Sequence, residues 1–297
     1  MEHVLTLVAP RGGLSAAMLH TARDALAALG AAAGTPDWLS PEEAADLPFE
    51  GLAPEQADAA ARAALTGQAV DIVALAAQGR RKRLLIADMD STIVTTETLD
   101  ELAGQAGIKD RIAAITKRAM NGELDFEGAL RERVGMLAGL SSEALQRTWE
   151  ETALMPGARE LVATMRANGA RCALVSGGFT FFTGRVADLV GFHEHHSNTL
   201  IEADGRLTGR VAEPILGRNA KLANLKRIAA AEGIGLDATL AVGDGANDLD
   251  MIQAAGLGVA FRAKPVVAAA ARARVDHGDL RALLFAQGYR AAEISDG

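Results

Sequence analysis

The chain has little of several things that would tie it to a particular environment. It contains one cysteine, Cys172, among 297 residues, so no disulfide can form within it, and this favours a reducing compartment. Aromatic residues make up only 4%, which argues against stacking on single-stranded nucleic acid. No apolar run reaches membrane-spanning length, and the N-terminus lacks a signal-peptide pattern. We therefore expect a cytoplasmic protein without membrane or nucleic-acid partners.

Positive charge is also in short supply. Lys and Arg total 30 against 38 Asp and Glu, a net charge of −8, which disfavours a general affinity for polyanions. The basic cluster Arg80-Arg81-Lys82-Arg83 precedes an apolar run, and we interpret it as a solvated junction between domains. Hydrophobic residues make up 49%, enough for a sizeable core in one large or two modest domains.

The N-terminal part predicts a small α+β module. Apolar patterning predicts a strand at 3–8, helices at about 14–29 and 54–65, and a strand at 71–76, with a polar stretch that reaches Glu50. We place this module at residues 1–78 and expect a ferredoxin-like arrangement with a regulatory role. The remainder, 79–297, forms the second predicted domain.

The second domain predicts a Rossmann-like α/β fold with a parallel sheet. Strands are expected near 84–87, 171–175, 239–242 and 256–261, with helices between them, which implies right-handed crossovers. Four helical stretches without a clear strand, within about 96–152, interrupt this alternation as an inserted block. The segment 197–211, centred on Asp204-Gly205, predicts a β-hairpin, and helices are expected to fill most of the tail.

Acidic residues follow two of the predicted strands. Asp88 and Asp90 come directly after the first, and Asp244 and Asp248 follow the third. Because the C-terminal ends of parallel strands meet at one edge of a sheet, these side chains should converge. Carboxylate oxygens are the ligands that Mg²⁺ prefers, so we predict a magnesium site there. The alternative is that Asp88 and Asp244 merely cap the following helices.

A third strand end and one lysine add features of a phosphate site. Ser176-Gly177-Gly178 lies between a strand and a helix, where free N–H groups and a hydroxyl can hold phosphate oxygens. Lys221 is the candidate for a fixed cation beside so many acids. The cluster His193, His195 and His196 has no neighbouring cysteine and irregular spacing, which argues against zinc and favours a partly exposed strand and turn. Cys172 is interpreted as an inert core thiol.

These motifs resemble a known family. The segments Asp88-Met89-Asp90-Ser91-Thr92, Ser176-Gly177-Gly178-Phe179, Lys221 and Gly243-Asp244-Gly245-Ala246-Asn247-Asp248 follow the order of the haloacid dehalogenase superfamily motifs. The resemblance covers about residues 82–290, and the particular residues within the motifs resemble those of the phosphoserine phosphatases in that superfamily. It implies a haloacid dehalogenase-like sheet with a helical cap, and Mg²⁺-dependent hydrolysis of O-phospho-L-serine, the last step of serine biosynthesis.

The resemblance also implies residue roles. Asp88 would be the nucleophile that forms an aspartyl-phosphate, and Asp90 the general acid and base. Mg²⁺ would be held by Asp88, the Asp90 carbonyl and Asp244, supported by Asp248. The residues that would bind the phosphate or the rest of the substrate are Ser176, Gly177, Lys221, Asn247, Glu97, Arg133, Met120 and Phe126. Glu97 would take the ammonium group and Arg133 the carboxylate, with Arg131 as an alternative register.

Other functions remain open at this point. The same motifs fit a phosphotransferase that passes the phosphoryl group to another alcohol, such as homoserine. A signalling receiver that only stores an aspartyl-phosphate is disfavoured, because it needs neither Asp90 nor a cap. Residues 1–78 occupy the place where some relatives carry a ligand-sensing ACT-type domain, and we expect this module to support a homodimer.

Overall fold

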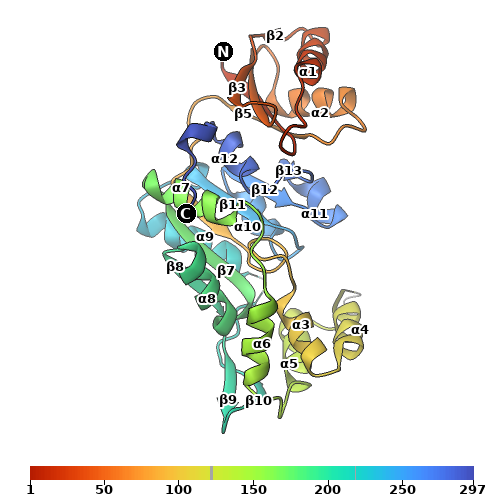
Figure 1. Ribbon diagram of the computed structural model, residues 1–297, viewed down its shortest axis with the longest axis vertical. Coiled ribbons are helices and arrows are strands. Elements are labelled where there is room, and N and C mark those ends of the chain that lie inside the picture. The colour runs from red at the N-terminus through yellow and green to blue at the C-terminus, as the bar shows by residue number, and fades with distance from the viewer. Residues whose placement is uncertain (121–122, 218) are drawn as a thin grey trace.

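The computed structural model describes residues 1–120, 123–217 and 219–297, apart from the side chains of residues 117, 119 and 120. An N-terminal module lies against a larger α/β domain, and a helical insert projects from the far side of that domain (Figure 1). The predicted fold class is confirmed in both parts: a small α+β sheet precedes a six-stranded parallel sheet.

The module contains a five-stranded antiparallel sheet in the order β2-β4-β1-β5, with β3 also paired to β4. The side chain of Ser15 accepts a hydrogen bond from the Met18 amide and so caps the first helix. The elements are β1 His3–Val8, α1 Ala16–Ala28, β2 Ala32–Ala33, β3 Asp37–Ser40, β4 Ala44–Glu50, α2 Pro54–Ala64 and β5 Asp71–Ala76.

The polar stretch before Glu50, in which the sequence pattern located no strand, forms part of the sheet. It contains β3 and β4, and β4 lies inside the sheet beside β1. Asp46 and Pro48 break the apolar alternation that normally marks a strand. The Asp46 carboxylate is tolerated because it accepts hydrogen bonds from the Thr6 hydroxyl at 2.7 Å and from Arg80 at 2.5 Å.

The larger sheet has the order β13-β12-β11-β6-β7-β8, with every neighbouring pair parallel. The chain starts in the middle at β6, builds outward to β8, and then returns to the other side of β6 at β11. The switch in direction therefore falls between β6 and β11, where ligands bind in doubly wound sheets. The strands are β6 Leu84–Ala87, β7 Arg171–Phe179, β8 Glu194–Asn198, β11 Thr239–Gly243, β12 Leu257–Phe261 and β13 Ala273–Val275.

Two apolar layers cover this sheet. Leu85 and Ala87 face the core that includes helices α7, α8 and α12, and Leu84 and Ile86 face the core that includes α9, α10 and α11. Strand β6 is thus buried on both faces, as an uninterrupted apolar run predicts. The helices are α7 Ala158–Ala167, α8 Thr180–Val190, α9 Ala220–Ala231, α10 Leu249–Ala254, α11 Pro265–Ala270 and α12 Ala282–Ala286, and two 3₁₀ turns are Leu236–Ala238 and Ala291–Glu293.

The predicted insert is helical in the described residues. It consists of α3 Thr98–Gln105, α4 Lys109–Met120, α5 Phe126–Gly135 and α6 Glu143–Glu151. The predicted hairpin is β9 Leu200–Ala203 and β10 Arg206–Val211, which packs against α5. Its turn places Asp204 at φ 50° and Gly205 at φ 72°, the left-handed conformations that a two-residue hairpin turn requires. We call α3–α6 the cap.

Two strand predictions in the larger domain also need correction. Strand β7 does not stop at Val175 but continues to Phe179, with an irregularity opposite β8. The histidine-rich segment forms β8, a partly exposed parallel strand at the outer edge of the sheet, as expected. The tail contains β13 as well as helices. Strand β13 has only three residues, so side-chain alternation alone does not reveal it.

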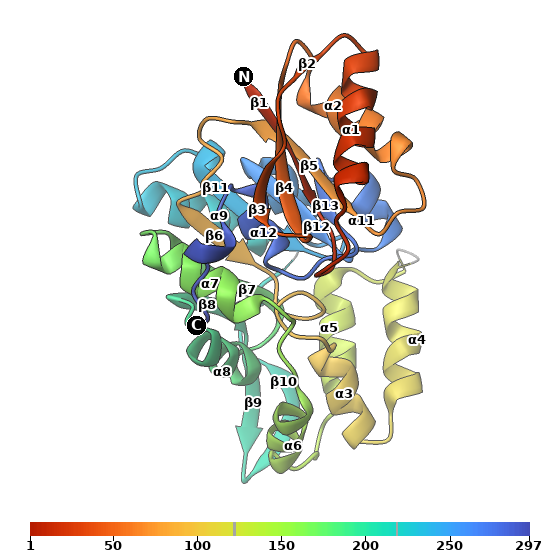
Figure 2. The same cartoon turned by 45° about the horizontal axis from the view of Figure 1, so that its top comes forward.

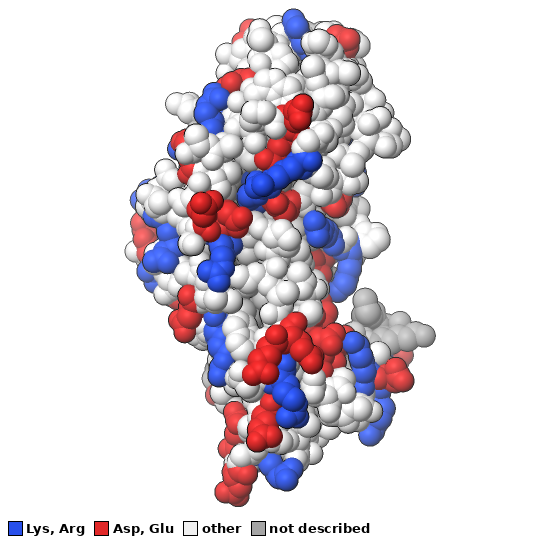
Figure 3. Space-filling view, in the orientation of Figure 1, with Lys and Arg blue, Asp and Glu red and all other residues white. Residues whose placement is uncertain are grey.

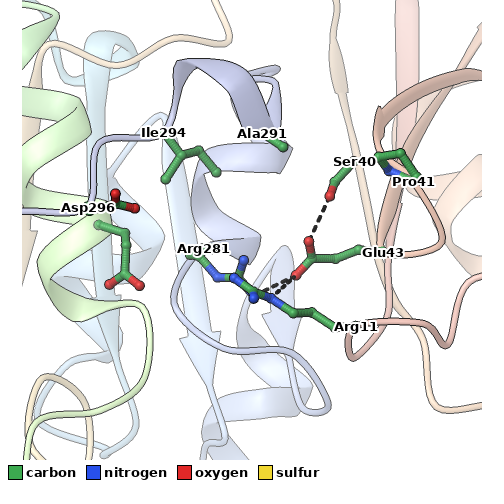
Figure 4. Close-up of a pocket in the computed structure, with 9 residues that line it drawn as sticks. Arg11, Ser40, Pro41, Glu43, Arg281, Ala291, Ile294 and Asp296 are labelled. Carbon is green, nitrogen blue, oxygen red and sulfur yellow. Dashed lines mark hydrogen bonds and ion pairs between the residues drawn. The ribbon is translucent and has the colours of Figure 1, made fainter.

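The two sheets meet through apolar and charged contacts. Val8, Leu39 and Ala44 of the module belong to the same core cluster as the α12 residues, and the module's sheet lies over α12 and beside β13 (Figure 2). A cavity of about 340 Å³ lies at this junction. There the Glu43 carboxylate accepts hydrogen bonds from Ser40 at 2.8 Å and Arg281 at 2.5 Å (Figure 4).

The basic linker lies at the junction of the two domains, with Arg81 and Arg83 exposed, and three of its cations also have protein partners. Arg80 pairs with Asp46 of the module, and Arg81 pairs with Glu293 at 2.7 Å near the end of the chain. Lys82 donates to the Asp237 carbonyl at 2.8 Å. Arg80 thus connects the linker to the module, while Arg81 and Lys82 hold the linker against the larger domain.

The surface carries both signs of charge. On the face shown in Figure 3, acidic and basic side chains are interspersed, with uncharged areas between them. Over the described part of the chain, no helix combines the length and the apolar character needed to cross a bilayer.

Candidate active site

The two acidic strand ends lie side by side. Strands β6 and β11 are adjacent, with Ala87 opposite Val242. Asp88 directly follows the last residue of β6, and Asp244 directly follows Gly243, the last residue of β11. The Asp88 amide extends this ladder by donating to the Val242 carbonyl at 3.0 Å. Both carboxylates therefore occupy the switch point of the sheet, as the strand pattern predicts.

Asp88, Asp244 and Asp248 form a buried group that could hold a metal ion. One carboxylate oxygen from each lies within 4.8 Å of the others, and Asp248 is fully buried. Asp248 is the N-cap residue of α10, but its side chain makes no capping hydrogen bond to that helix. Its Oδ2 accepts the Gly245 amide at 2.9 Å, and a Cβ on Gly243 would lie 2.3 Å from its Cγ, so only glycine fits there.

Lys221 is the cation that faces these acids. It is the second residue of α9, and its Nζ lies 2.6 Å from Asp88 Oδ1 and also contacts Asp248 Oδ1. Burial alone would lower the pKa of Lys221, but Asp248 and Asp88 raise it above its ordinary value. The lysine is therefore held charged.

One lysine does not balance three carboxylates. Burial and then the charge of Asp248 raise the pKa of Asp88 well above its usual range, and the same two causes raise the pKa of Asp244 to about 6. Lys264 adds only a distant contact, 3.9 Å from Asp244 Oδ2. Such an excess of buried negative charge is the environment in which a divalent cation is strongly favoured.

Asp90 has the properties of a proton-transfer group. Its Oδ1 accepts the Thr98 amide at 2.9 Å, which fixes the carboxyl group at the start of the cap. Burial and then the nearby Glu97 raise the pKa of Asp90 to about 7. A carboxyl group with this pKa can both donate and accept a proton near neutral pH.

The segment Ser176–Gly178 lies across from Asp90, and we call it the phosphate loop. The Gly178 amide donates to Ser176 Oγ at 2.9 Å, and a Cβ on Gly178 would lie 3.1 Å from Asp90 Oδ2. Five predicted substrate-binding residues line one cavity of about 10 Å³ here, namely Phe126, Ser176, Gly177, Lys221 and Asn247. That volume holds about one water molecule.

The cap brings the predicted ammonium and carboxylate ligands near each other. Ser91, a non-glycine residue at φ 54°, donates its hydroxyl to Glu97 at 2.8 Å. Burial lowers the pKa of Arg133, while Asp100 and Glu97 oppose this. In contrast, Arg131 pairs on the surface with Glu213 at 2.9 Å and Glu127 at 3.2 Å. The structure therefore favours Arg133 over Arg131 as the inward-facing arginine.

One predicted site residue lies outside the description, and three residues near the site were not predicted. The side chain of Met120 lies outside the described residues. Asn198 and Asp100, which sequence reasoning missed, are a buried amide behind the phosphate loop and an acid near Arg133. Lys264 also escaped notice, although the strand-end rule that found Asp88 would have found it three residues after β12.

The histidines and the cysteine take structural positions. The side chain of His193 accepts the Cys172 amide at 3.0 Å, that of His195 contacts the Thr183 hydroxyl at 3.0 Å, and that of His196 contacts Glu194 at 2.8 Å. Each ring thus has a different protein partner. Burial raises the pKa of Cys172 to about 12, which confirms the interpretation of an inert thiol.

Comparison with known proteins places this site in a family. The model of haloacid dehalogenase-like hydrolases matches residues 85–253. The phosphoserine phosphatase of Streptomyces coelicolor is 44% identical over 235 residues, which cover 79% of this chain and 57% of that protein. The chain thus spans about half the length of the curated relatives it matches first.

Two solved structures agree with the fold. A haloacid dehalogenase family hydrolase from Salmonella enterica serovar Typhi superposes with a TM-score of 0.83 at 28% identity, covering 95% of this chain and 98% of that one. A phosphoserine phosphatase with an analogue of a phospho-aspartyl intermediate gives a TM-score of 0.64 at 41% identity, covering 69% and 98%. With its acids at the switch point and Lys221 between them, the chain belongs to the haloacid dehalogenase-like hydrolases.

Proposed function

We propose that this chain is a phosphoserine phosphatase, which hydrolyses O-phospho-L-serine to L-serine and phosphate as the last step of serine biosynthesis. The observation that carries the proposal is the juxtaposition of Asp88, held by Lys221, with Asp90, whose pKa is raised to about 7. The similarity to phosphoserine phosphatases at 41–44% identity supports the choice of substrate.

The proposed reaction has two steps. In the first, an Asp88 oxygen forms a bond to phosphorus while the bond to the serine oxygen breaks, and Asp90 donates its proton to that oxygen. In the second, Asp90 takes a proton from water, whose oxygen attacks phosphorus and releases Asp88 and phosphate. Lys221 and the phosphate loop stabilise the charge on the transferring group.

The buried acids fit Mg²⁺ as the cation. All three side chains offer hard carboxylate oxygens, and their excess negative charge is uncompensated by Lys221. We propose Asp88, the Asp90 carbonyl and Asp244 as ligands. Asp248 supports them, because both of its oxygens are already engaged by Lys221 and Gly245. Bound Mg²⁺ would supply additional neutralisation of phosphate charge.

The cap is proposed to bind the amino-acid part of the substrate and so to select it. Glu97 would bind the ammonium group, and Arg133 the carboxylate through its planar guanidinium. Phe126 and Met120 would contact the apolar side, and Asn247 the substrate or phosphate. A cavity of about 10 Å³ is too small for phosphoserine, so the cap must open to admit it.

A phosphate-release screen tests this function. Phosphoserine, phosphothreonine, phosphoethanolamine, sugar phosphates and p-nitrophenyl phosphate are compared with Mg²⁺ and with EDTA. We expect a preference for phosphoserine and no turnover in EDTA. Equal rates on sugar phosphates would contradict the roles of Glu97 and Arg133. A phosphorylated acceptor in place of free phosphate, with homoserine present, would indicate the transferase instead.

Three further proposals concern organisation. We propose the domain limits 1–78 and 79–297 with the cap at about 96–152, a cytoplasmic location, and a homodimer formed through the module. Light scattering of the full chain tests the dimer. The module's shared core with α12 means that a fragment of residues 1–78 would expose an apolar face, so ligand binding is also best measured on the full chain.

A further inference from the structure

Asn198 is a buried polar residue that no part of the proposed chemistry uses. It is the last residue of β8, beside β7 (Figure 1), and only 1% of its surface is exposed. Its Nδ2 donates to the Gly177 carbonyl at 3.0 Å and to the Leu216 carbonyl at 3.5 Å, and its Oδ1 accepts the Leu216 amide at 2.8 Å. One side chain thus joins the phosphate loop to the segment before Lys221.

The bond to Gly177 fixes a peptide plane of the phosphate loop. The carbonyl of Gly177 and the amide of Gly178 belong to one peptide unit, and in a trans peptide these groups point in opposite directions. With the carbonyl held by Asn198, the amide is directed to Ser176 Oγ, 2.9 Å away. Asn198 therefore determines how the Ser176 hydroxyl is presented.

The bonds to Leu216 fix the opposite wall of the cavity. Leu216 and Gly217 line the same cavity as Ser176, Gly177 and Lys221. Asn198 does not line it, so its effect on the bound phosphate is indirect. A primary amide offers donors and an acceptor at one end. These match the Gly177 carbonyl on one wall and the amide and carbonyl groups of Leu216 on the other.

We propose that Asn198 is a positioning residue for phosphoryl transfer, which holds the phosphate loop and the segment before Lys221 at the separation that the transferring phosphoryl group needs. The proposal rests on the proposed function only in that the site binds a phosphoryl group. It places no demand on the amino-acid part of the substrate, because Glu97 and Arg133 lie on the cap.

Two variants and one matched control test the proposal. Asn198→Ala removes every bond, and Asn198→Asp keeps the shape and the acceptor for Leu216 but replaces the donors to Gly177 with a carboxylate oxygen. Ser197→Ala is the control, because Ser197 is also buried on β8 but bonds Thr183 of α8 at 2.6 Å. For each protein we measure kcat, KM, inhibition by orthovanadate and the melting temperature.

We expect kcat of both Asn198 variants to fall about 10²-fold, as for misplaced reacting groups, with KM for phosphoserine changing less than about threefold. Orthovanadate affinity should weaken with kcat, and Ser197→Ala should keep the parental kcat. If Asn198→Ala does not fold, Asn198→Asp, which leaves no cavity, carries the test. Parental kcat in a folded Asn198 variant, or equal losses in Ser197→Ala, would overturn the proposal.

Failure of the proposed function would be recognised separately. If the parent protein cleaves p-nitrophenyl phosphate but not phosphoserine, the substrate assignment is wrong, and the Asn198 comparison is made with p-nitrophenyl phosphate. Calorimetric binding of orthovanadate needs no substrate at all. Equal orthovanadate affinity in the parent and in Asn198→Ala, or no binding by the parent, would refute the positioning role.

Discussion

The active-site end of the parallel sheet and the domain junction both bury charged side chains. The two regions differ in whether each buried acid has its own hydrogen-bond donors or cation. At the junction, Asp71 accepts the amides of Asp276, His277 and Gly278 at 2.7–3.2 Å, and Glu43 is bonded by Ser40 and Arg281. At the active-site end, Asp88, Asp244 and Asp248 share Lys221. Satisfied buried charges hold two domains together, whereas an uncompensated group is prepared for a ligand.

The largest expected effect comes from removing the charge at Asp88. Asp88→Asn should lower kcat by about 10⁴-fold or more, because the amide cannot form the acyl-phosphate. Its melting temperature in EDTA should not fall, since one of three mutually repelling carboxylates is gone. Phosphate release and calorimetry measure these. Asp188→Asn, on the exposed face of α8, is the control and should match the parent in both measurements. A strongly lowered melting temperature of Asp88→Asn would show that the charge of Asp88 stabilises the fold, against the expected difference between the site and the junction.

A second test compares two arginines on one helix of the cap. Arg133→Ala should lower kcat/KM for phosphoserine by about 100-fold, because a charged hydrogen bond to the substrate carboxylate is lost. Arg131→Ala, which removes surface pairs with Glu127 and Glu213, should change kcat/KM less than about twofold. Steady-state kinetics with phosphoserine and phosphoethanolamine decide this; the reverse order would assign the carboxylate to Arg131.

Substitutions of Asp71 at the domain junction should lower the stability of the protein but leave its catalytic rate unchanged. Asp71→Ala leaves the amides of Asp276, His277 and Gly278 without their acceptor, so the free energy of unfolding should fall by about 3 kcal/mol. Asp71→Asn retains one acceptor oxygen and should lose less. Denaturant unfolding measures both. Turnover by folded Asp71→Ala should equal that of the parent, and a large fall in kcat would show that the junction and the site are coupled.

The smallest effect concerns Glu194, a paired acid at the start of β8, the outermost strand, which β7 separates from β6. Burial would raise the pKa of Glu194, but hydrogen bonds from His196, Arg227 and Arg171 lower it to about 2. The folded state thus binds fewer protons here than the unfolded state, so this stabilisation is complete above pH 4.5 and is lost as the pH falls toward 2.

Thermal melts against pH test this expectation. Glu194→Gln should melt about 2 °C below the parent at pH 6, and the difference should vanish under acid conditions. Glu232→Gln is a useful comparison, because its carboxylate lies 3.9 Å from Arg171 and is more exposed, so its effect should be smaller. A difference that persists unchanged to pH 2 would mean that Glu194 acts through packing.

Local signals predicted much of the site. The apolar run of β6 ends in Asp88, the turn Asp204-Gly205 forces a hairpin, and Lys221 follows from the order of the motifs. The missed features are non-local. The proposed role of Asn198 depends on its hydrogen bonds to Gly177 and Leu216, which are 21 and 18 residues away in the sequence. The residues next to Asn198 in the sequence do not indicate these bonds.

The sequence by itself determined which segments are strands buried on both faces and where their acidic ends lie, because apolar runs and the residues that stop them are local properties. Only the tertiary structure decided which charges are satisfied. Glu43 and Arg281 are 238 residues apart and pair at 2.5 Å, while Asp88 meets Asp244 and Asp248 with Lys221 as their near cation. Burial and partner distance set the energy of a charge, and both exist only after the strands have paired.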